Sequence, residues 1–358
     1  MFGLGKEKGV VGLDIGSYSI KALELHPKKK DENLYEVKKI GYELIPRDAI
    51  VEGTIIDAAA VSETIKLIFD ENKIANKNVA ISISGNSVII KKISLPPMET
   101  EELSESIIWE AKHNIPYPYE ETNVDYAILT PPSAAKDKNL DILLVAAKKD
   151  IIANYSNVVH QARKNLEAIE VDVFALQNTL EINYPEIFAE MTVAILNIGA
   201  NRTNTIIVEK GIPQLFRDLS LGGFLFTENI SKDLNIGFED AEKALKGLPV
   251  KDYPPEKLDA ALKANIENLL GEIEKTFTFY EAGEKKERKI DRIFLSGGLS
   301  KLKNLPSVAE KIFHIKTEIF NPFRRISFDQ KKYHSVDFDE LAVHFGVAAG
   351  LATRKLEK

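Results

Sequence analysis

Short apolar runs separated by small polar residues make up much of the first third of the chain. Residues 10–15 and 20–25 are two such runs, and the turn between them contains Gly16 and Ser17, so we expect two adjacent strands. A helix is predicted after Asp57, because the side chain of this residue can cap a first helical turn. Further strands are expected at residues 34–40, 79–83 and 88–93.

Prolines interrupt this pattern just after the last of these strands. A helix is predicted at 100–114, where apolar residues recur at helical spacing until Pro116 and Pro118 end it. The next expected elements are a strand at 141–147, a helix at 150–164 and a strand at 170–174. We expect residues 94–165 to form a small subdomain inserted into a larger unit.

An internal repeat is the most informative feature of the second half. Residues 10–24 read VVGLDIGSYSIKALE and residues 193–209 read VAILNIGANRTNTIIVE. Each segment is an apolar strand, a turn of small residues and a second β-branched strand, with Asp14 aligned to Asn197. The match predicts a duplicated unit. A helix-rich stretch at about 223–283 follows, and then a strand at 292–296 that runs into Gly297-Gly298.

Composition narrows the classes of protein. The 358 residues allow about two domains. Hydrophobic residues make up 44% of the chain, which is enough apolar surface for a core, and the net charge of −7 argues against a general electrostatic attraction to nucleic acid. The absence of cysteine excludes disulfides and thiolate-ligated metals. No stretch is long and apolar enough to predict a transmembrane helix.

The first hairpin is a candidate phosphate site. A glycine-containing turn lets backbone N–H groups approach an anion, and Ser17 and Ser19 add hydroxyl donors. Lys21 can reach a phosphate as a point charge, and Asp14 can hold a hydrated Mg²⁺. The same residues also fit a plain β-hairpin with a glycine turn.

Three further features can contribute to one site. The turn at 197–203 repeats the first hairpin, so the two turns can face each other across one phosphate chain. Gly297-Gly298 lets backbone approach a base or a phosphate, but it also fits an ordinary turn between a strand and a helix. Glu242 and Lys246 share a helix face, where a surface ion pair is the simpler explanation.

The order of these four features resembles the actin-like ATPase superfamily, which includes actin, hexokinase and the Hsp70 chaperones. Four segments look like the PilM family of type IV pilus assembly proteins: LDIGSYSIKALEL, RDLSLGGFLFTENISKDLNIGFEDAEKALK, IFLSGGLSKLKNLP and FGVAAGLATR. The segment KKISLPPMETEELSESIIWEAKHNIPYPYEETNVDYAIL is similar to the small subdomain inserted in PilM and in the cell-division protein FtsA. The resemblance covers nearly the whole chain.

The resemblance implies an α/β fold in which an actin/Hsp70-like unit is duplicated into two lobes around a nucleotide cleft. The first lobe would contain residues 1–93 and 166–192, with a C-terminal helix at about 336–358 packing back on it. A small α+β subdomain at 94–165 would be inserted in that lobe. The second lobe would contain residues 193–335, including a helical part at about 223–289.

The resemblance also implies roles in binding ATP and Mg²⁺. Asp14 would hold Mg²⁺ through water, and Lys21 would reach the β-phosphate. The first phosphate turn would consist of Gly16, Ser17, Tyr18 and Ser19, and the second of Asn197, Gly199, Ala200 and Thr203. Glu242 and Lys246 would approach the ribose and adenine. Backbone would approach the nucleotide at Gly222, Gly223, Gly297, Gly298 and Leu299.

One residue departs from the superfamily pattern. Asn197 stands where the second hairpin usually begins with Asp, and a neutral amide cannot act as a carboxylate base. We therefore expect ATP to bind and its hydrolysis to be slow or absent. Gln177 is a candidate for positioning water, although a solvent-facing glutamine is the simpler explanation.

The function implied by the resemblance is that of an ATP-binding scaffold in the type IV pilus inner-membrane assembly complex. The protein would lie on the cytoplasmic face of the membrane and bind the N-terminal cytoplasmic segment of PilN. Two alternatives stay open, an FtsA-like filament-forming division protein and a cytoplasmic subunit of a related type II secretion machine. A homo-oligomer also stays open.

Overall fold

Two five-stranded sheets with the same strand order form the body of the protein. The computed structural model describes residues 9–28, 31–130, 139–251, 253–283, 288–329, 333 and 337–354. The first sheet has the order β10–β6–β1–β2–β3 and the second the order β13–β12–β11–β14–β15. In each sheet, three consecutive antiparallel strands are joined to two parallel ones. The internal repeat in the sequence therefore marks the first hairpin of each copy of one unit.

The strands of the first sheet are β1 (Val11–Ile15), β2 (Ser19–Lys28), β3 (Asp31–Leu44), β6 (Asn78–Ile83) and β10 (Asn165–Val171). Those of the second are β11 (Thr192–Ile198), β12 (Thr203–Glu209), β13 (Ile212–Leu219), β14 (Arg292–Ser296) and β15 (Lys316–Ile319). The central strands β1 and β11 are almost wholly buried. This explains why they read as continuous apolar runs rather than as alternating patterns.

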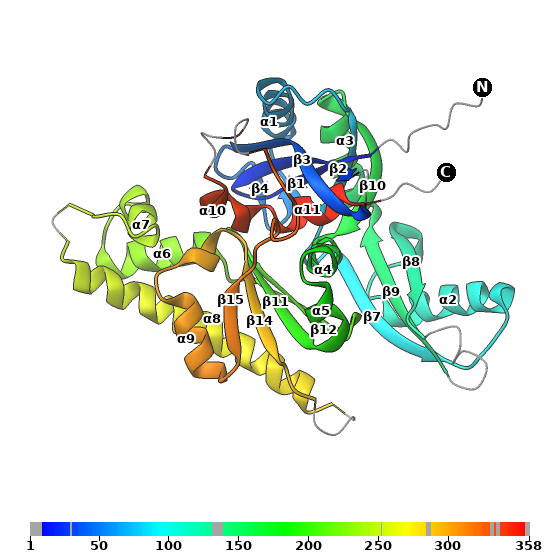
Figure 1. Ribbon diagram of the computed structural model, residues 1–358. Coiled ribbons are helices and arrows are strands. Elements are labelled where there is room, and N and C mark those ends of the chain that lie inside the picture. Colours follow the sequence, from blue (N-terminus) through cyan, green and yellow to red (C-terminus); the bar gives the residue numbers. More distant parts are fainter. Residues whose placement is uncertain are drawn as a thin grey trace.

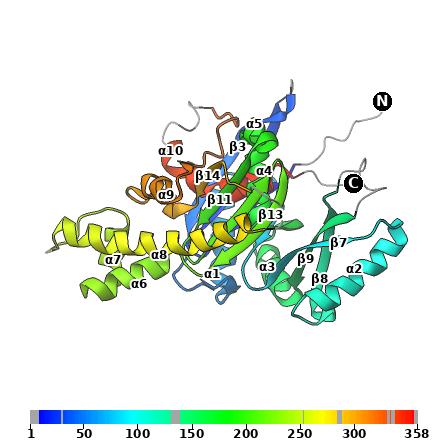
Figure 2. The ribbon, with the colours of Figure 1, turned by 90° about the horizontal axis from the view of Figure 1, so that it is seen from below.

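A third sheet lies beside the first. It has the order β7–β9–β8, formed by β7 (Val88–Leu95), β9 (Leu140–Lys148) and β8 (Thr122–Ile128), and it is entirely antiparallel. Helix α2 (Thr100–Asn114) buries Leu103, Ile107 and Ala111 against this sheet. Figures 1 and 2 show this group on one side of the molecule and helices α6 to α8 on the other.

The remaining helices cover the two large sheets. Beside the first sheet lie α1 (Ala58–Glu71) and α3 (Lys149–Gln161), whose apolar residues share one core with β1 and β6. Beside the second lie α6 (Gly223–Leu234), α7 (Phe238–Leu245), α8 (Pro255–Glu281) and α9 (Leu305–Phe313). The shorter elements are β4 (Ile50–Val51), β5 (Thr54–Ile55), η1 (Tyr119–Glu121), α5 (Pro185–Glu190), η2 (Gly298–Lys301), α10 (Phe338–Leu341) and η3 (Ala342–His344).

Two helices, α4 (Asp172–Asn183) and α11 (Gly346–Ala352), pack against each other between the large sheets. Their backbones approach closely because glycine stands at each contact. A Cβ on Gly350 would lie 1.8 Å from Ala175 O, and a Cβ on Gly12 in β1 would lie 2.1 Å from Ala348 O. The approach of α11 to both neighbours therefore requires glycine.

Local predictions were confirmed where a pattern was clear. The Asp57 side chain accepts a hydrogen bond from Ala60 N at 2.9 Å and caps α1, and α2 has the predicted bounds. The strand predicted at 170–174 was wrong, because β10 ends at Val171 and α4 begins at Asp172. The predicted helix-rich stretch consists of the three helices α6, α7 and α8. The proposed boundaries between lobes remain predictions.

No helix in the described part of the chain is both long and apolar enough to cross a membrane.

The crossing of α11 over α4 gives a first testable prediction. Gly350→Ala should lower the free energy of unfolding by about 2–3 kcal/mol or more, because the added methyl group overlaps backbone that cannot move freely. Chemical denaturation of the full chain measures this change. Gly271→Ala is the matched control, since nothing lies within 4 Å of a Cβ there and α8 should gain up to about 1 kcal/mol. Equal effects of the two substitutions would contradict this packing.

Candidate functional site

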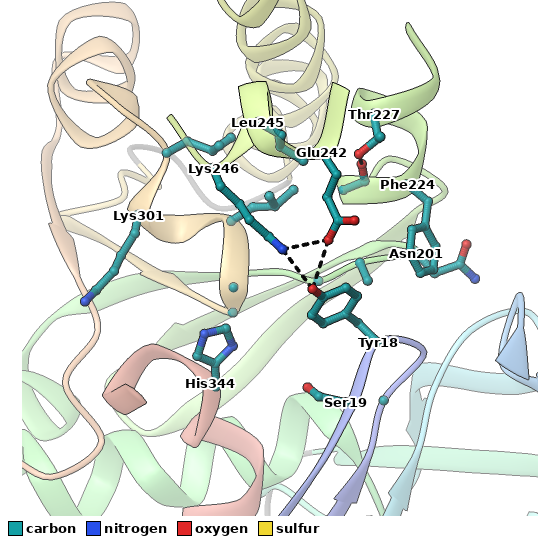
Figure 3. Close-up of a pocket in the computed structure, with 18 of the residues that line it drawn as sticks. Tyr18, Ser19, Asn201, Phe224, Thr227, Glu242, Leu245, Lys246, Lys301 and His344 are labelled. Carbon is teal, nitrogen blue, oxygen red and sulfur yellow. Dashed lines mark hydrogen bonds and ion pairs between the residues drawn. The ribbon is translucent and has the colours of Figure 1, made fainter. Parts of the chain in front are cut away.

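A cavity of 830 Å³ lies where the turns of the two repeated hairpins face each other. Its walls come from both large sheets, from helices α6 to α8 and from the segment around η3. Figure 3 shows labelled side chains from the two hairpins, from α6 and α7 and from η3 at this cavity. The volume is within the range of pockets that hold small-molecule ligands, roughly 300–1,000 Å³.

The first hairpin places a cation and a carboxylate side by side. Asp14 and Lys21 are opposite each other in the register of β1 and β2, and Lys21 Nζ lies 3.2 Å from Asp14 Oδ2. The turn is closed by a hydrogen bond from Gly16 N to Ser19 O at 3.1 Å. Both charged side chains are largely buried, so their charges are less screened than at an open surface. The arrangement can offer an ammonium group to a phosphate and a carboxylate to a hydrated cation.

The second hairpin is held by the start of helix α6. Gly199 N donates to Arg202 O at 2.9 Å to close the turn, while Gly223 N and Phe224 N donate to Gly199 O and Ala200 O. Gly222 permits this contact, because a Cβ there would lie 2.6 Å from Arg202 N. The first N–H groups of α6 are thereby satisfied by the hairpin, which fixes the position of the turn.

The Gly297-Gly298 turn lies against the second hairpin. Gly297 has φ +84°, and a Cβ there would lie 2.5 Å from Ile198 O. Both the backbone conformation and the close contact therefore require glycine. His344 from η3 is adjacent, with its Cε1 atom 3.0 Å from the ideal Cβ position of Gly298. Burial, and then the positive charges of Lys21 and Lys301, lowers the pKa of His344 to about 4. The imidazole is therefore neutral near pH 7.

A hydrogen-bonded triad connects the first hairpin to α7 (Figure 3). The Tyr18 hydroxyl donates to Glu242 Oε1 at 2.9 Å and accepts from Lys246 Nζ at 3.0 Å. Lys246 Nζ also donates to Glu242 Oε1 at 2.7 Å. The hydrogen bond from Lys246 lowers the pKa of Glu242, so this carboxylate is ionised at neutral pH. The pair thus reaches across the molecule to Tyr18 and is more than a surface ion pair within one helix.

Asp172 contributes a second carboxylate to the cavity. It is the first residue of α4, directly after β10, and it lines the same wall as Asp14. Burial, reinforced by the negative charge of Asp14, raises the pKa of Asp172 to about 6. A carboxyl group that titrates near neutral pH inside a cavity is suited to accepting or donating a proton.

Most of the predicted site residues line this cavity. They are Asp14, Gly16, Ser17, Tyr18, Ser19, Lys21, Asn197, Gly199, Ala200, Gly223, Glu242, Lys246, Gly297, Gly298 and Leu299. Three predicted residues lie outside it. The hydroxyl of Thr203 donates to Leu221 O at 2.7 Å. Gly222 packs against the backbone of the second hairpin. Gln177 Nε2 donates to Gly211 O at 3.3 Å.

Sequence reasoning missed several residues of the site, including Asp172, Arg202, Phe224 and His344. A partial signal existed for Asp172, because it is an acidic residue at the end of a strand, as Asp14 is, although β10 is only partly buried and β1 is almost wholly buried. Because the strand was predicted to continue through residue 174, Asp172 was not recognised as the residue that follows the strand. His344 had no such signal, since only the folding of the C-terminal segment against the first lobe brings it to the cavity.

The donors present fit a hydrated Mg²⁺ held together with a bound phosphate group. The described residues contain no cluster of three or more His, Asp or Glu side chains that could bind a metal on their own. Mg²⁺ commonly keeps several waters and takes one or two carboxylates plus ligand phosphates. Asp14 and Asp172 supply such carboxylates on one wall of the cavity.

The raised pKa of Asp172 predicts a pH-dependent stability difference. Ionising Asp172 is harder in the folded than in the unfolded chain, so wild-type stability is lost as the pH rises from about 4 through 6. Asp172→Asn should therefore be more stable than wild type at pH 8, by roughly 1–3 kcal/mol, and equal to it near pH 4. Thermal and chemical unfolding of the ligand-free chain across this range measure the difference.

The exposed Asp233 supplies the control, since Asp233→Asn should change stability by less than about 0.5 kcal/mol at every pH. A stability gain in Asp172→Asn that does not vary with pH would contradict the assignment.

Comparisons with known proteins agree with this architecture. The family described as "Type IV pilus assembly protein PilM" matches residues 12–356. The solved "PilM-PilN type IV pilus biogenesis complex" contains a chain that superposes with a TM-score of 0.86 at 26% identity, covering 99% of this chain and 100% of that one. The fold class predicted from the sequence is confirmed.

More distant relatives share the fold. The cell division protein FtsA of Bacillus subtilis (strain 168) is 22% identical over 363 residues, which cover 87% of this chain and 78% of FtsA. The ethanolamine utilization protein EutJ from Carboxydothermus hydrogenoformans superposes with a TM-score of 0.57 at 13% identity, over 96% of this chain and 89% of EutJ. Because the PilM match spans nearly the whole chain, the protein belongs to the PilM family of type IV pilus assembly proteins and has an actin-like ATPase fold.

Proposed function

We propose that the protein is an ATP-binding scaffold of the pilus assembly complex, and that it binds the N-terminal cytoplasmic segment of a PilN partner. The observation that carries this proposal is the similarity, over 99% of the chain, to the PilM-PilN complex. Binding to PilN would hold the protein at the cytoplasmic face of the inner membrane. The cavity between the hairpins supplies the nucleotide site.

In this proposal the phosphates of ATP lie between the two hairpin turns. Lys21 would contact the β-phosphate, and Asp14 would hold Mg²⁺ through water, with Asp172 on the same wall. The adenosine would lie against Gly297-Gly298, which line the cavity beside the second hairpin. Glu242 and Lys246 are the polar groups available to the ribose and adenine, and they would exchange part of their contact with Tyr18 for contact with the nucleotide.

Slow turnover is the expected behaviour at this site. Bound Mg²⁺ would offset the charge of the phosphates, and Asp172 is the carboxyl group available to take up a proton. Asn197 also lines the cavity, but its neutral amide cannot accept a proton as a carboxylate does. We therefore propose that occupancy of the site, rather than rapid hydrolysis, is what the scaffold uses.

A second cavity is the candidate groove for the partner. It has a volume of 420 Å³ and lies between β7 of the small sheet and β13 of the second large sheet. Both strands are at the edge of their sheets. Val88, Ile90 and Phe216 supply apolar side chains to its walls, and Tyr117 lies at the side near α2. Polar residues, among them Ser84, Asn204 and Asp218, complete the lining. A short extended segment with apolar side chains fits such a groove between two sheet edges.

Loss of the Lys21 ammonium group tests the nucleotide site. Lys21→Met should weaken the binding of ATP·Mg²⁺ at least tenfold, because Lys21 is the one cationic side chain that the described residues of the first hairpin contribute to the cavity lining. Calorimetric titration of the full chain with ATP and Mg²⁺ measures the affinity. Lys66→Met on the surface of α1 is the control and should leave it unchanged. An unchanged affinity in Lys21→Met would refute this placement of the phosphates.

The partner groove is tested at its rim. Tyr117→Ala should weaken binding of a peptide copy of the PilN N-terminal segment by about tenfold, because it removes a large aromatic contact from one side of the groove. Fluorescence anisotropy with the labelled peptide measures the change. Tyr126→Ala, on the opposite edge strand of the same small sheet, should have no effect on peptide affinity. If Tyr126→Ala alone weakened binding, the groove would lie elsewhere on this subdomain.

A further inference from the structure

The two cavities share part of their walls. Ser84 and Asn204 line both of them, although the first cavity opens between the hairpins and the second lies beside the small sheet. The main side chain between them is Arg202, which lines the first cavity and extends toward the second. A change in the position of Arg202 therefore reaches both cavities.

The backbone of Arg202 belongs to the second hairpin, but its side chain crosses to the first lobe. Its carbonyl closes the turn by accepting from Gly199 N at 2.9 Å. Its Nη2 atom donates to Glu52 O, between β4 and β5, at 2.9 Å. Only 12% of the side chain is exposed, so the guanidinium group is held in place by protein rather than by solvent.

The same guanidinium group packs directly on Gly85, in the turn that leads into β7. Gly85 has φ +89°, and a Cβ on it would lie 1.9 Å from Arg202 Nη1. Val88 N, at the start of β7, donates to Gly85 O at 2.9 Å. This turn is therefore the point at which the first lobe continues into the small sheet that forms one wall of the second cavity.

Asp218 completes the junction from β13. Its Oδ2 atom accepts from Gly85 N at 2.8 Å and lies 4.0 Å from Arg202 Nη1, while its Oδ1 atom accepts from Asn204 Nδ2 at 2.6 Å. The ion pair with Arg202 is at the outer limit of such contacts, whereas the bond to Gly85 is short. Arg202 thus has donor capacity that Asp218 does not use.

We propose that Arg202 is the positioning residue that links occupancy of the nucleotide cavity to the shape of the partner groove. A guanidinium group prefers a phosphate to a distant carboxylate, because it can form two parallel charge-assisted hydrogen bonds with it. A phosphate group between the hairpins draws Arg202 away from Asp218 and Gly85. The Gly85 turn then repositions β7 against β13, and the groove between these strands changes.

This inference rests on the proposed function, since it requires one ligand in each cavity. Linkage makes it quantitative: if ATP changes the affinity for the partner by some factor, the partner must change the affinity for ATP by the same factor. We expect a factor of about five or more in the wild-type protein, and a factor close to one when Arg202 can no longer act on Gly85.

The experiment measures ATP affinity of the full chain, in Mg²⁺, with and without a saturating peptide copy of the PilN N-terminal segment. Arg202→Lys keeps the positive charge but removes the planar guanidinium group, which can form two parallel hydrogen bonds. Gly85→Ala lies outside both hairpins, and its methyl group would displace the guanidinium group of Arg202. Arg47→Lys is the matched control. Arg47 also crosses between the lobes, over the Phe238 ring at 3.6 Å, whereas the atoms nearest the Cβ position of Gly85 belong to Arg202.

Coupling that is lost in Arg202→Lys and Gly85→Ala and kept in Arg47→Lys supports the proposal. Coupling that persists in the first two variants, or that Arg47→Lys abolishes equally, overturns it. Amide hydrogen exchange of the wild-type chain gives a readout that needs no variant, because ATP·Mg²⁺ should change the protection of the Gly85 amide, and unchanged protection overturns the proposal. Failure of the wild-type chain to bind ATP or the peptide would instead refute the proposed function on which it rests.

Discussion

The contact of α11 with β1 on one side and α4 on the other is the constraint on which the site depends. Three backbones meet there at distances that leave no room for a Cβ on Gly12 or Gly350. Because α4 also packs against β12 of the second sheet, this contact fixes how the two copies of the repeated unit face each other. The turns of both hairpins open on one cavity as a result, although each hairpin is a local structure.

Features formed by contiguous residues could be predicted from the sequence, whereas features that depend on tertiary packing could not. Both hairpins were predictable, because a buried strand, a turn of small residues and a second strand are contiguous in the chain. Helix α4 was not recognised, since it is surrounded by protein on several sides and has no polar face to reveal a helical period. The bound hydroxyl of Thr203 and the amide of Gln177 could not be placed either, because their partners, Leu221 and Gly211, are determined by tertiary packing.

The polar contacts of the cavity also show which residues act locally and which act between lobes. Asp14 and Lys21 face each other within one hairpin, so their pairing follows from strand register alone. Tyr18 and Arg202 instead reach partners in the other lobe, on α7 and on the β4–β5 and Gly85 turns. Contacts between lobes are the ones that a bound ligand can rearrange without unfolding either sheet, since each sheet keeps its own hydrogen bonds.

The charges of the cavity give a physical reason for the neutral residue at position 197. Lys21 is paired with Asp14, Lys246 with Glu242, Lys301 with Glu340 and Lys303 with Asp259. Among the described residues, no ion pair involves Asp172, and burial, reinforced by the charge of Asp14, already raises its pKa. A carboxylate at position 197 would add a further negative charge to the cavity, which would repel the phosphates of the proposed nucleotide. The amide of Asn197 avoids that repulsion and also removes the possibility of a second carboxylate base. Under the proposed function, both effects would favour retaining a nucleotide over cleaving it.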